Sequence, residues 1–139
     1  MEYDIHNHVK VRTGIAPVAA LGADTDSAVI DTVGFESFEW LIAMGVITTG
    51  TFSLVFEESD VVTFGGEETL VPAANLLGAS PTYIATDDGQ VRRIGVTGKK
   101  RFQRCTLVGA STPVATGAVL ALLGNPKTVP VGAQATAEV

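Results

Sequence analysis

Apolar and polar residues alternate one by one along two neighbouring segments of this chain. In the first segment, residues 35–44, the large apolar side chains of one face are Phe38, Trp40, Ile42 and Met44, and the other face holds Ser37, Glu39, Leu41 and Ala43. In the second, residues 51–58, they are Phe52, Leu54 and Phe56. Successive side chains of a β-strand point to opposite faces, so a period of two residues predicts a half-buried strand. We therefore expect two strands whose large apolar side chains face the core.

Turn residues separate further short apolar segments along the chain. We expect additional strands at residues 28–33, 82–86, 91–97, 101–108 and 114–123, and turns at residues 45–50, 87–90, 98–100 and 109–113. The Asp-Gly pair at 88–89 is typical of a tight hairpin turn. We expect two hairpins across residues 82–123, with 91–97 and 101–108 also joined by a tight turn. We also expect an acidic loop at residues 57–69, with an edge strand at 61–64. A helical turn is expected within residues 70–77.

Several short strands without a long helix are typical of an antiparallel sandwich or barrel. We predict an all-β fold, an antiparallel jelly-roll-like β-sandwich with an extended N-terminal arm and a C-terminal tail. The expected organisation is an arm and loop at residues 1–27, the β-sandwich at 28–124 and the tail at 125–139. A single domain near this length buries about two-thirds of its unfolded surface, so it needs no disulfide or metal to fold.

The charged residues are divided into two blocks along the sequence. Residues 13–91 hold twelve of the 15 carboxylates and no basic residue, and residues 92–127 hold seven of the nine Lys and Arg side chains and no carboxylate. We expect one negative and one positive region on the body, which would orient a partner or a second copy in a salt-sensitive manner. The net charge of −6 argues against nucleic acid as the partner.

The low content of charge indicates that part of the surface is covered by protein. Charged residues make up 17% of the chain, against about 25% in an average domain. The longest apolar run, at 114–123, is too short to span a bilayer. The first residues also lack the basic and apolar regions of a secretory signal. We therefore expect a protein partner and no membrane.

No arrangement of reactive side chains predicts catalysis. His6 and His8 have only Asp4 nearby and lack a third ligand with the spacing of a metal site. Cys105 is in a predicted strand far along the chain from both histidines, which predicts a buried or half-buried structural thiol. Gly65 and Gly66 are followed by two glutamates, which would repel a phosphate. We expect no enzyme activity, no cofactor and no bound metal.

Two groups of residues are the candidate interface with a protein partner or with a second copy. The first lies in the arm and could add a strand or fill a groove of a partner; the second is the basic cluster of the predicted hairpin. Docking on protein is the favoured interpretation of this cluster, and a merely solvated hairpin is the alternative. The residues are Tyr3, Ile5, His6, Val9, Val11, Arg92, Arg93, Lys99, Lys100, Arg101 and Arg104.

The order of several short motifs resembles a known family. The motifs are Leu21-Gly22-Ala23-Asp24-Thr25, Val29-Ile30-Asp31-Thr32, Gly34-Phe35-Glu36-Ser37, Val55-Phe56-Glu57-Glu58-Ser59-Asp60, Lys100-Arg101-Phe102-Gln103-Arg104 and Leu123-Gly124-Asn125-Pro126. Together with the turn at 45–50 they resemble the capsid cement, or decoration, proteins of tailed bacteriophages over roughly residues 20–127. Nothing in the arm matches the family.

The resemblance implies a jelly-roll sandwich that assembles as a homodimer, or as a trimer, on the outside of the phage head. There it would bridge neighbouring subunits of the major capsid protein and resist the internal pressure of DNA. The implied location is the virion surface, and the host cytoplasm during assembly. Two alternatives stay open: a carbohydrate- or host-surface-binding sandwich that would use Trp40 or Tyr83, and a head–tail joining or tail-tube subunit.

Overall fold

Two strands of 25 residues each, β4 (Phe35–Ser59) and β9 (Phe102–Pro126), run side by side through the whole molecule. They are antiparallel, and their register pairs Phe35 with Pro126 at one end and Ser59 with Phe102 at the other. The computed structural model describes residues 4–131. In this part of the chain every strand pairs, directly or through a neighbour, with β4 or β9.

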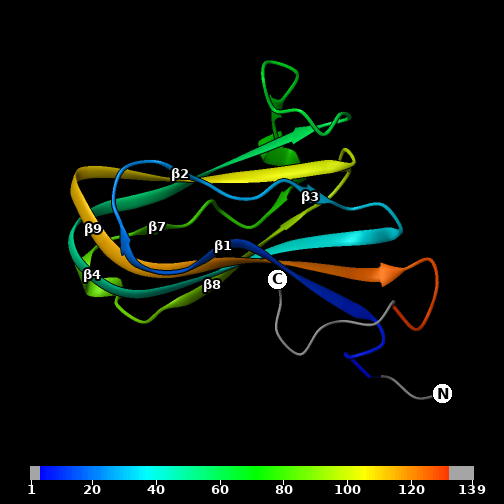
Figure 1. Cartoon of the computed structure of the whole chain (residues 1–139), viewed down its shortest axis with the longest axis horizontal. Helices are drawn as coiled ribbons and strands as arrows, with labels where there is room; N and C mark the ends of the chain where they lie inside the picture. Colours follow the sequence, from blue (N-terminus) through cyan, green and yellow to red (C-terminus); the bar gives the residue numbers. More distant parts are fainter. Residues whose placement is uncertain (1–3, 132–139) are drawn as a thin grey trace.

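Both long strands bend near their middle, so that one continuous ladder becomes two layers. The register between β4 and β9 is irregular from Met44 to Thr51. Figure 1 shows both ribbons turning back at the left of the view and continuing in a second layer. Each long strand thus contributes one half to each layer of a β-sandwich.

The first layer, sheet I, contains the first half of β4 and the second half of β9. They are flanked by β1 (Val9–Leu21) beside β9, by β8 (Val91–Val96) beside β4, and by the short β6 (Leu76–Leu77) beyond β8. The second layer, sheet II, contains the other two halves. The strands β2 (Thr25–Asp26) and β3 (Ile30–Asp31) flank β9 there, and β5 (Thr69–Leu70) and β7 (Thr82–Tyr83) flank β4.

The strand order of these sheets is that of a jelly roll. Eight strand segments result when β2 and β3 are counted as one, β5 and β7 as one, each half of β4 and β9 separately, and the two-residue β6 at the edge of sheet I is left out. Numbered along the chain, they lie in the order 1-8-3-6 in sheet I and 2-7-4-5 in sheet II. This double-sheet arrangement is one way in which antiparallel proteins limit exposed edges. The predicted all-β antiparallel sandwich is confirmed.

Special backbone conformations produce the bends. Gly50 in β4 has a φ of 80°, and Ser111 and Thr112 in β9 have φ values of 60° and 53°. This left-handed region is open to glycine and costly for other residues. The segments 45–50 and 109–113, predicted as turns between separate strands, are therefore corners within continuous strands.

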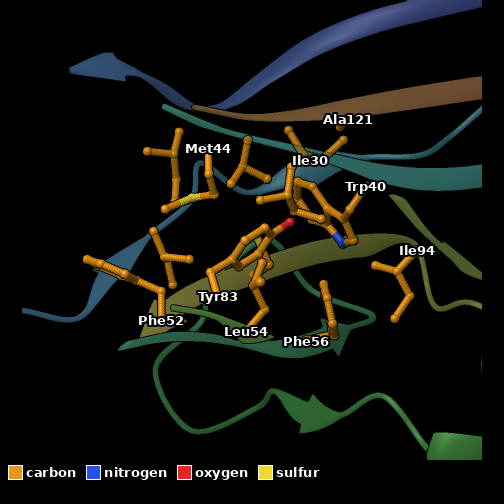
Figure 2. Close-up of a cluster of buried hydrophobic side chains, with 14 of the residues drawn as sticks. Ile30, Trp40, Met44, Phe52, Leu54, Phe56, Tyr83, Ile94 and Ala121 are labelled. Carbon is orange, nitrogen blue, oxygen red and sulfur yellow. The ribbon is translucent and has the colours of Figure 1, made fainter. Parts of the chain in front are cut away.

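The core lies between the two sheets and contains the side chains that the alternation selected. Those of β4 in sheet I are Phe38, Trp40, Ile42 and Met44, and those in sheet II are Phe52, Leu54 and Phe56; all are buried. Figure 2 shows Trp40, Met44, Phe52, Leu54 and Phe56 meeting between the layers, with Ile30, Tyr83, Ile94 and Ala121 from other strands. The prediction of the buried face is confirmed for both segments.

The predicted hairpins across residues 82–123 are wrong. β7 pairs with β4 in sheet II and β8 pairs with β4 in sheet I, so residues 84–90 connect two layers. The Asp-Gly segment bonds to the corner of β4: Asp88 Oδ1 accepts from the Ile47 amide at 2.7 Å, and the Gly89 amide donates to Gly45 O at 3.0 Å. Likewise β8 does not pair with β9, and residues 101–108 and 114–123 are two halves of one strand.

The expected boundaries of the arm and of the acidic loop also differ from the structure, and residues 132–139 of the predicted tail lie outside the described residues. Residues 9–21, expected in the arm, form β1 and pair with residues 115–124 of β9, because this apolar segment completes sheet I. Residues 61–64 form no strand; β5 pairs with residues 57–58 instead. The predicted helical turn is the 3-10 helix η1 (Ala73–Asn75), and a second one, η2 (Ala85–Asp87), precedes β8. Within residues 4–131 no helix is long and apolar enough to cross a membrane.

Candidate docking face

The candidate residues of the arm that the structure describes divide into two groups. Tyr3 lies outside the described residues. Ile5, with 78% of its surface exposed, and the exposed His6 precede β1. Val9 and Val11 lie within β1, opposite Gly124 and Leu122 of β9. Only the two valines therefore belong to a sheet surface.

The basic residues expected on one hairpin lie on different parts of the sandwich. Arg92 and Arg93 are neighbours in β8 and point to opposite faces. Arg92 covers the ring of Tyr83 at 4.5 Å from its centroid and lies 3.1 Å from Asp87 Oδ1. Arg93 is 75% exposed and lies 3.5 Å from Glu39 Oε1 on the outer side of sheet I. Of the six basic residues, Arg93 alone shares that outer side with Val9 and Val11.

The two lysines of the cluster bond to neighbouring loops and strands. Lys99 Nζ donates to Phe35 O at 3.0 Å, and Lys100 Nζ donates to Thr69 Oγ1 at 3.2 Å. Both link the 97–101 connection to the acidic half of the chain. These contacts give the lysines a structural role within the monomer.

Arg104 is the most enclosed arginine of the cluster, with 16% of its side chain exposed. Its guanidinium lies 2.5 Å from Glu57 Oε2, 3.6 Å from Asp26 Oδ2 and 3.8 Å from Glu68 Oε1. It also stacks over the ring of Phe64 at 4.7 Å. Burial alone would lower the pKa of Arg104, but the bond to Glu57 and the surrounding carboxylates raise it. Arg104 thus binds the acidic loop to the outer side of sheet II.

The expected separation into one negative and one positive region is wrong. The ion pairs between described residues are Arg92–Asp87, Arg93–Glu39, Arg101–Asp31, Lys127–Glu36, and Arg104 with Asp26, Glu57 and Glu68. Each joins the basic block to the acidic block, because β8 and β9 lie beside the strands and loops that carry the carboxylates. Arg101, for example, donates two hydrogen bonds to Asp31, which lower the pKa of that carboxyl.

Sheet I presents a largely aliphatic outer face. Its residues alternate with the buried ones along each strand and lie opposite one another across the ladder. They are Val9, Val11 and Thr13 of β1; Ser37, Glu39, Leu41 and Ala43 of β4; Leu77 of β6; Val91, Arg93 and Gly95 of β8; and Ala118, Leu120, Leu122 and Gly124 of β9. Glu39 and Arg93 are the two charged members. We call these fifteen residues the outer face.

One end of the outer face is hollowed. The hollow has a volume of about 290 Å³ and includes residues from five strands of sheet I, among them Val9, Gly95 and Leu122. Leu77, with 63% of its surface exposed, stands at its border. Its walls are mainly apolar. A partner side chain of similar character would lose contact with water there.

Neither reactive group singled out in the sequence forms a chemical site. The carboxylate of Asp4 accepts a hydrogen bond from the Asn7 amide at 2.6 Å, and His8 Nδ1 lies 2.8 Å from the backbone oxygen of Asp4. In the described part of the chain no group of three or more His, Cys, Asp and Glu side chains is placed to hold a metal ion. Cys105 is fully buried, so the prediction of a structural thiol is confirmed.

We expect alkaline pH to destabilise the protein through two buried acids. Burial raises the pKa of the Cys105 thiol and of the Tyr83 phenol, each to about 12. In the unfolded chain the thiol loses its proton near pH 8.5 and the phenol near pH 10. Between these values and about pH 12, only the native state keeps both groups protonated. The free energy of unfolding should therefore fall above pH 9, by up to about 1.4 kcal/mol per pH unit for each group.

Thermal unfolding between pH 7 and 11 measures this effect. Cys105→Ala should flatten the decline in stability that starts near pH 9. Tyr83→Phe should flatten the part of this decline that lies above pH 10. Both predictions concern the slope with pH and not the stability of the variant at pH 7. An unchanged slope in both variants would contradict the prediction.

The aromatic residues proposed for a sugar site are part of the core. Trp40 and Tyr83 are both 0% exposed, and Figure 2 shows them between the two sheets. Neither ring can stack on a carbohydrate at the surface. The carbohydrate-binding alternative therefore loses the two side chains on which it depended.

The sequence did contain a signal for the outer face. Residues 120–123, Leu-Ala-Leu-Leu, are apolar at every position, so both faces of that strand are apolar. A continuous apolar run is typical of a strand that is covered on both sides. Sequence reasoning identified the strand and did not select Leu120 or Leu122 as interface residues.

The fold defines this chain as an all-β sandwich of jelly-roll strand order. No family model matches the chain, and no curated protein matches it. One similar solved structure is a Bacillus endospore appendage from a family of disulfide-linked pili, with 14% identity and a TM-score of 0.40 over 91% of this chain and 97% of that one. Another is a family two carbohydrate esterase from Cellvibrio japonicus, with 11% identity and a TM-score of 0.39 over 86% of this chain. The chain spans 32% of the length of that esterase.

Proposed function

We propose that this chain is a structural virion protein that binds the outside of a tailed-phage head and cements neighbouring subunits of the major capsid protein. The observation that carries the proposal is the outer face of sheet I. The sandwich already has a complete core, yet it presents a second aliphatic surface with a single pair of opposite charges. Surfaces of this kind on a monomer mark sites of protein–protein contact.

A small cement subunit works by repetition. Many modest contacts on one shell add up, because each bound copy holds its neighbours at a high effective concentration. The motifs that resemble the decoration proteins support this assignment, as does the jelly-roll strand order of the sandwich.

The ion pairs within the chain change the salt dependence that we expect for attachment to the phage head. Five of the seven cations of the basic block are paired with carboxylates of the chain, so they contribute little to attachment. Attachment that uses few unpaired charges should persist at about 1 M NaCl, where the range of exposed charge interactions falls to about 3 Å. This replaces the salt-sensitive association expected from the sequence.

Binding to phage heads tests the function. Heads that lack this chain, from a tailed phage whose genome encodes it, are mixed with the purified protein and sedimented at low and high salt. We expect saturable binding in both conditions, and electron cryomicroscopy should show the added density at regular positions on the outer surface. Absence of binding, or density confined to a ring at the head–tail junction, would contradict the proposal.

A further inference from the structure

The outer face is apolar on strands whose inner face already forms the core. In β9, Ala121 and Leu123 are buried in the core, whereas Leu120 and Leu122 are partly exposed on the opposite side. An antiparallel sheet with one side in water ordinarily carries polar residues on that side. The outer face is therefore expected to be covered by protein in the assembled state.

We infer that the cover is the outer face of a second copy of this chain, packed across a two-fold axis. The inference rests on the proposed function, because it names the partner of the same face. Two sheets packed in this way lie about 10 Å apart with their strands at a small angle. Capsid contacts then fall to the remaining surfaces of a dimer.

The charges of the outer face are self-complementary. Glu39 in β4 and Arg93 in β8 lie on adjacent strands, 3.5 Å apart, with most of Arg93 exposed. A two-fold interface brings the same patch of both copies together, so each charge must meet an acceptable group of the other. An axis between these two side chains places each Glu39 opposite the second copy's Arg93. A face with one charge alone would instead set like charges against each other.

The size of the face is sufficient for a dimer of modest affinity. Four strands about 4.8 Å apart and seven residues of about 3.4 Å each span roughly 20 Å by 25 Å. Two such faces would hide about 1,000 Å² in total, the lower limit for a specific interface. An interface of this size is reversible, which suits a subunit that has to find its place on a shell.

Sedimentation of the full chain over a range of concentrations tests the dimer. We expect the wild type to pass from monomer to dimer as its concentration rises. Leu122→Glu should weaken the dimer at least about tenfold. The matched control is Val55→Glu, which introduces the same charge at an outward position of β4 on sheet II and should dimerise as the wild type does. Circular dichroism establishes that each variant is folded.

A mixing experiment separates contacts between copies from contacts within one chain. Glu39→Arg makes the outer face doubly positive and Arg93→Glu makes it doubly negative, so each variant alone should remain a monomer. Mixed in equal amounts, they should form a heterodimer at least as tight as the wild-type dimer. The intramolecular ion pair is lost in both variants, so its loss does not explain recovery on mixing.

The outcomes distinguish this inference from the proposed function. A wild type that stays monomeric at its highest soluble concentration, variants that dimerise normally, or a mixture that fails to associate would each overturn the inference. If the chain is monomeric and still decorates heads, the inference fails and the cement function stands. If the chain dimerises through this face and does not bind heads, the cement function fails and the inference stands.

Discussion

Gly50→Ala should destabilise the protein by about 3 kcal/mol or more, because Gly50 is at the corner where β4 passes from sheet I to sheet II. A Cβ there would lie 2.6 Å from Ala110 O and 2.6 Å from Pro113 Cα, both backbone atoms of the β9 corner. Its φ of 80° adds the cost that a left-handed conformation imposes on alanine. Urea unfolding followed by the fluorescence of Trp40 measures the loss.

Gly89→Ala is the matched control for that substitution. Gly89 has a similar φ of 70°, but a Cβ there would meet no atom within 4 Å. Alanine at this position should therefore cost about 1 kcal/mol, the conformational penalty alone. Equal losses of unfolding free energy at the two positions would show that the close contact between the corners of β4 and β9 does not make Gly50 necessary.

Arg104→Met should destabilise the protein by about 2 to 3 kcal/mol, since it leaves enclosed carboxylates without their cation. Glu57 and Glu68 are each about one-fifth exposed and approach the Arg104 guanidinium from opposite segments of the chain. Methionine keeps the apolar stem, so the change isolates the charge. The loop around Phe64 should also open, which proteolysis of the native protein and amide hydrogen exchange in residues 60–68 would detect.

Arg101→Met is the comparison for the enclosed arginine. Arg101, the last residue of the 97–101 connection, also pairs with a carboxylate, that of Asp31, and stacks on the ring of Phe102 at 4.8 Å. Its side chain is 52% exposed, so water screens the pair. We expect a much smaller change in unfolding free energy and no change in proteolysis of the acidic loop. A loss as large as that of Arg104→Met would show that enclosure does not set the strength of these pairs.

The two charge blocks show how a sequence pattern can be real and its interpretation incomplete. The segregation along the chain holds for residues 13–91 and 92–127. In the fold, β8 and the first half of β9 lie next to the acidic segments, so five of the seven cations of the basic block pair with carboxylates of the acidic block. The blocks therefore encode complementarity within the chain, and the assembly that we propose uses the aliphatic outer face instead.

The candidate interface was only partly predictable. Val9 and Val11 were selected from the arm and Arg93 from the basic cluster, and the structure brings these three to the outer face. Leu41, Leu120 and Leu122 complete it from segments that the sequence identified only as strands. Which residues share one face of a sheet depends on which strands pair with each other. Strand pairing joins segments that are far apart in the sequence, so a local pattern does not reveal it.

The alternation of residues by itself determined that this protein is all-β and which side chains of β4 form the core. Period two defines the faces of a strand because it follows from backbone geometry at each residue. Tertiary structure decided the rest. Turn-forming residues permit a hairpin, a corner or a crossover alike, and the choice among them depends on pairing between segments far apart in the chain. The segments 45–50 and 109–113 became corners because β4 and β9 pair along their whole length, and burying both sheets against one core requires both strands to bend at the same place.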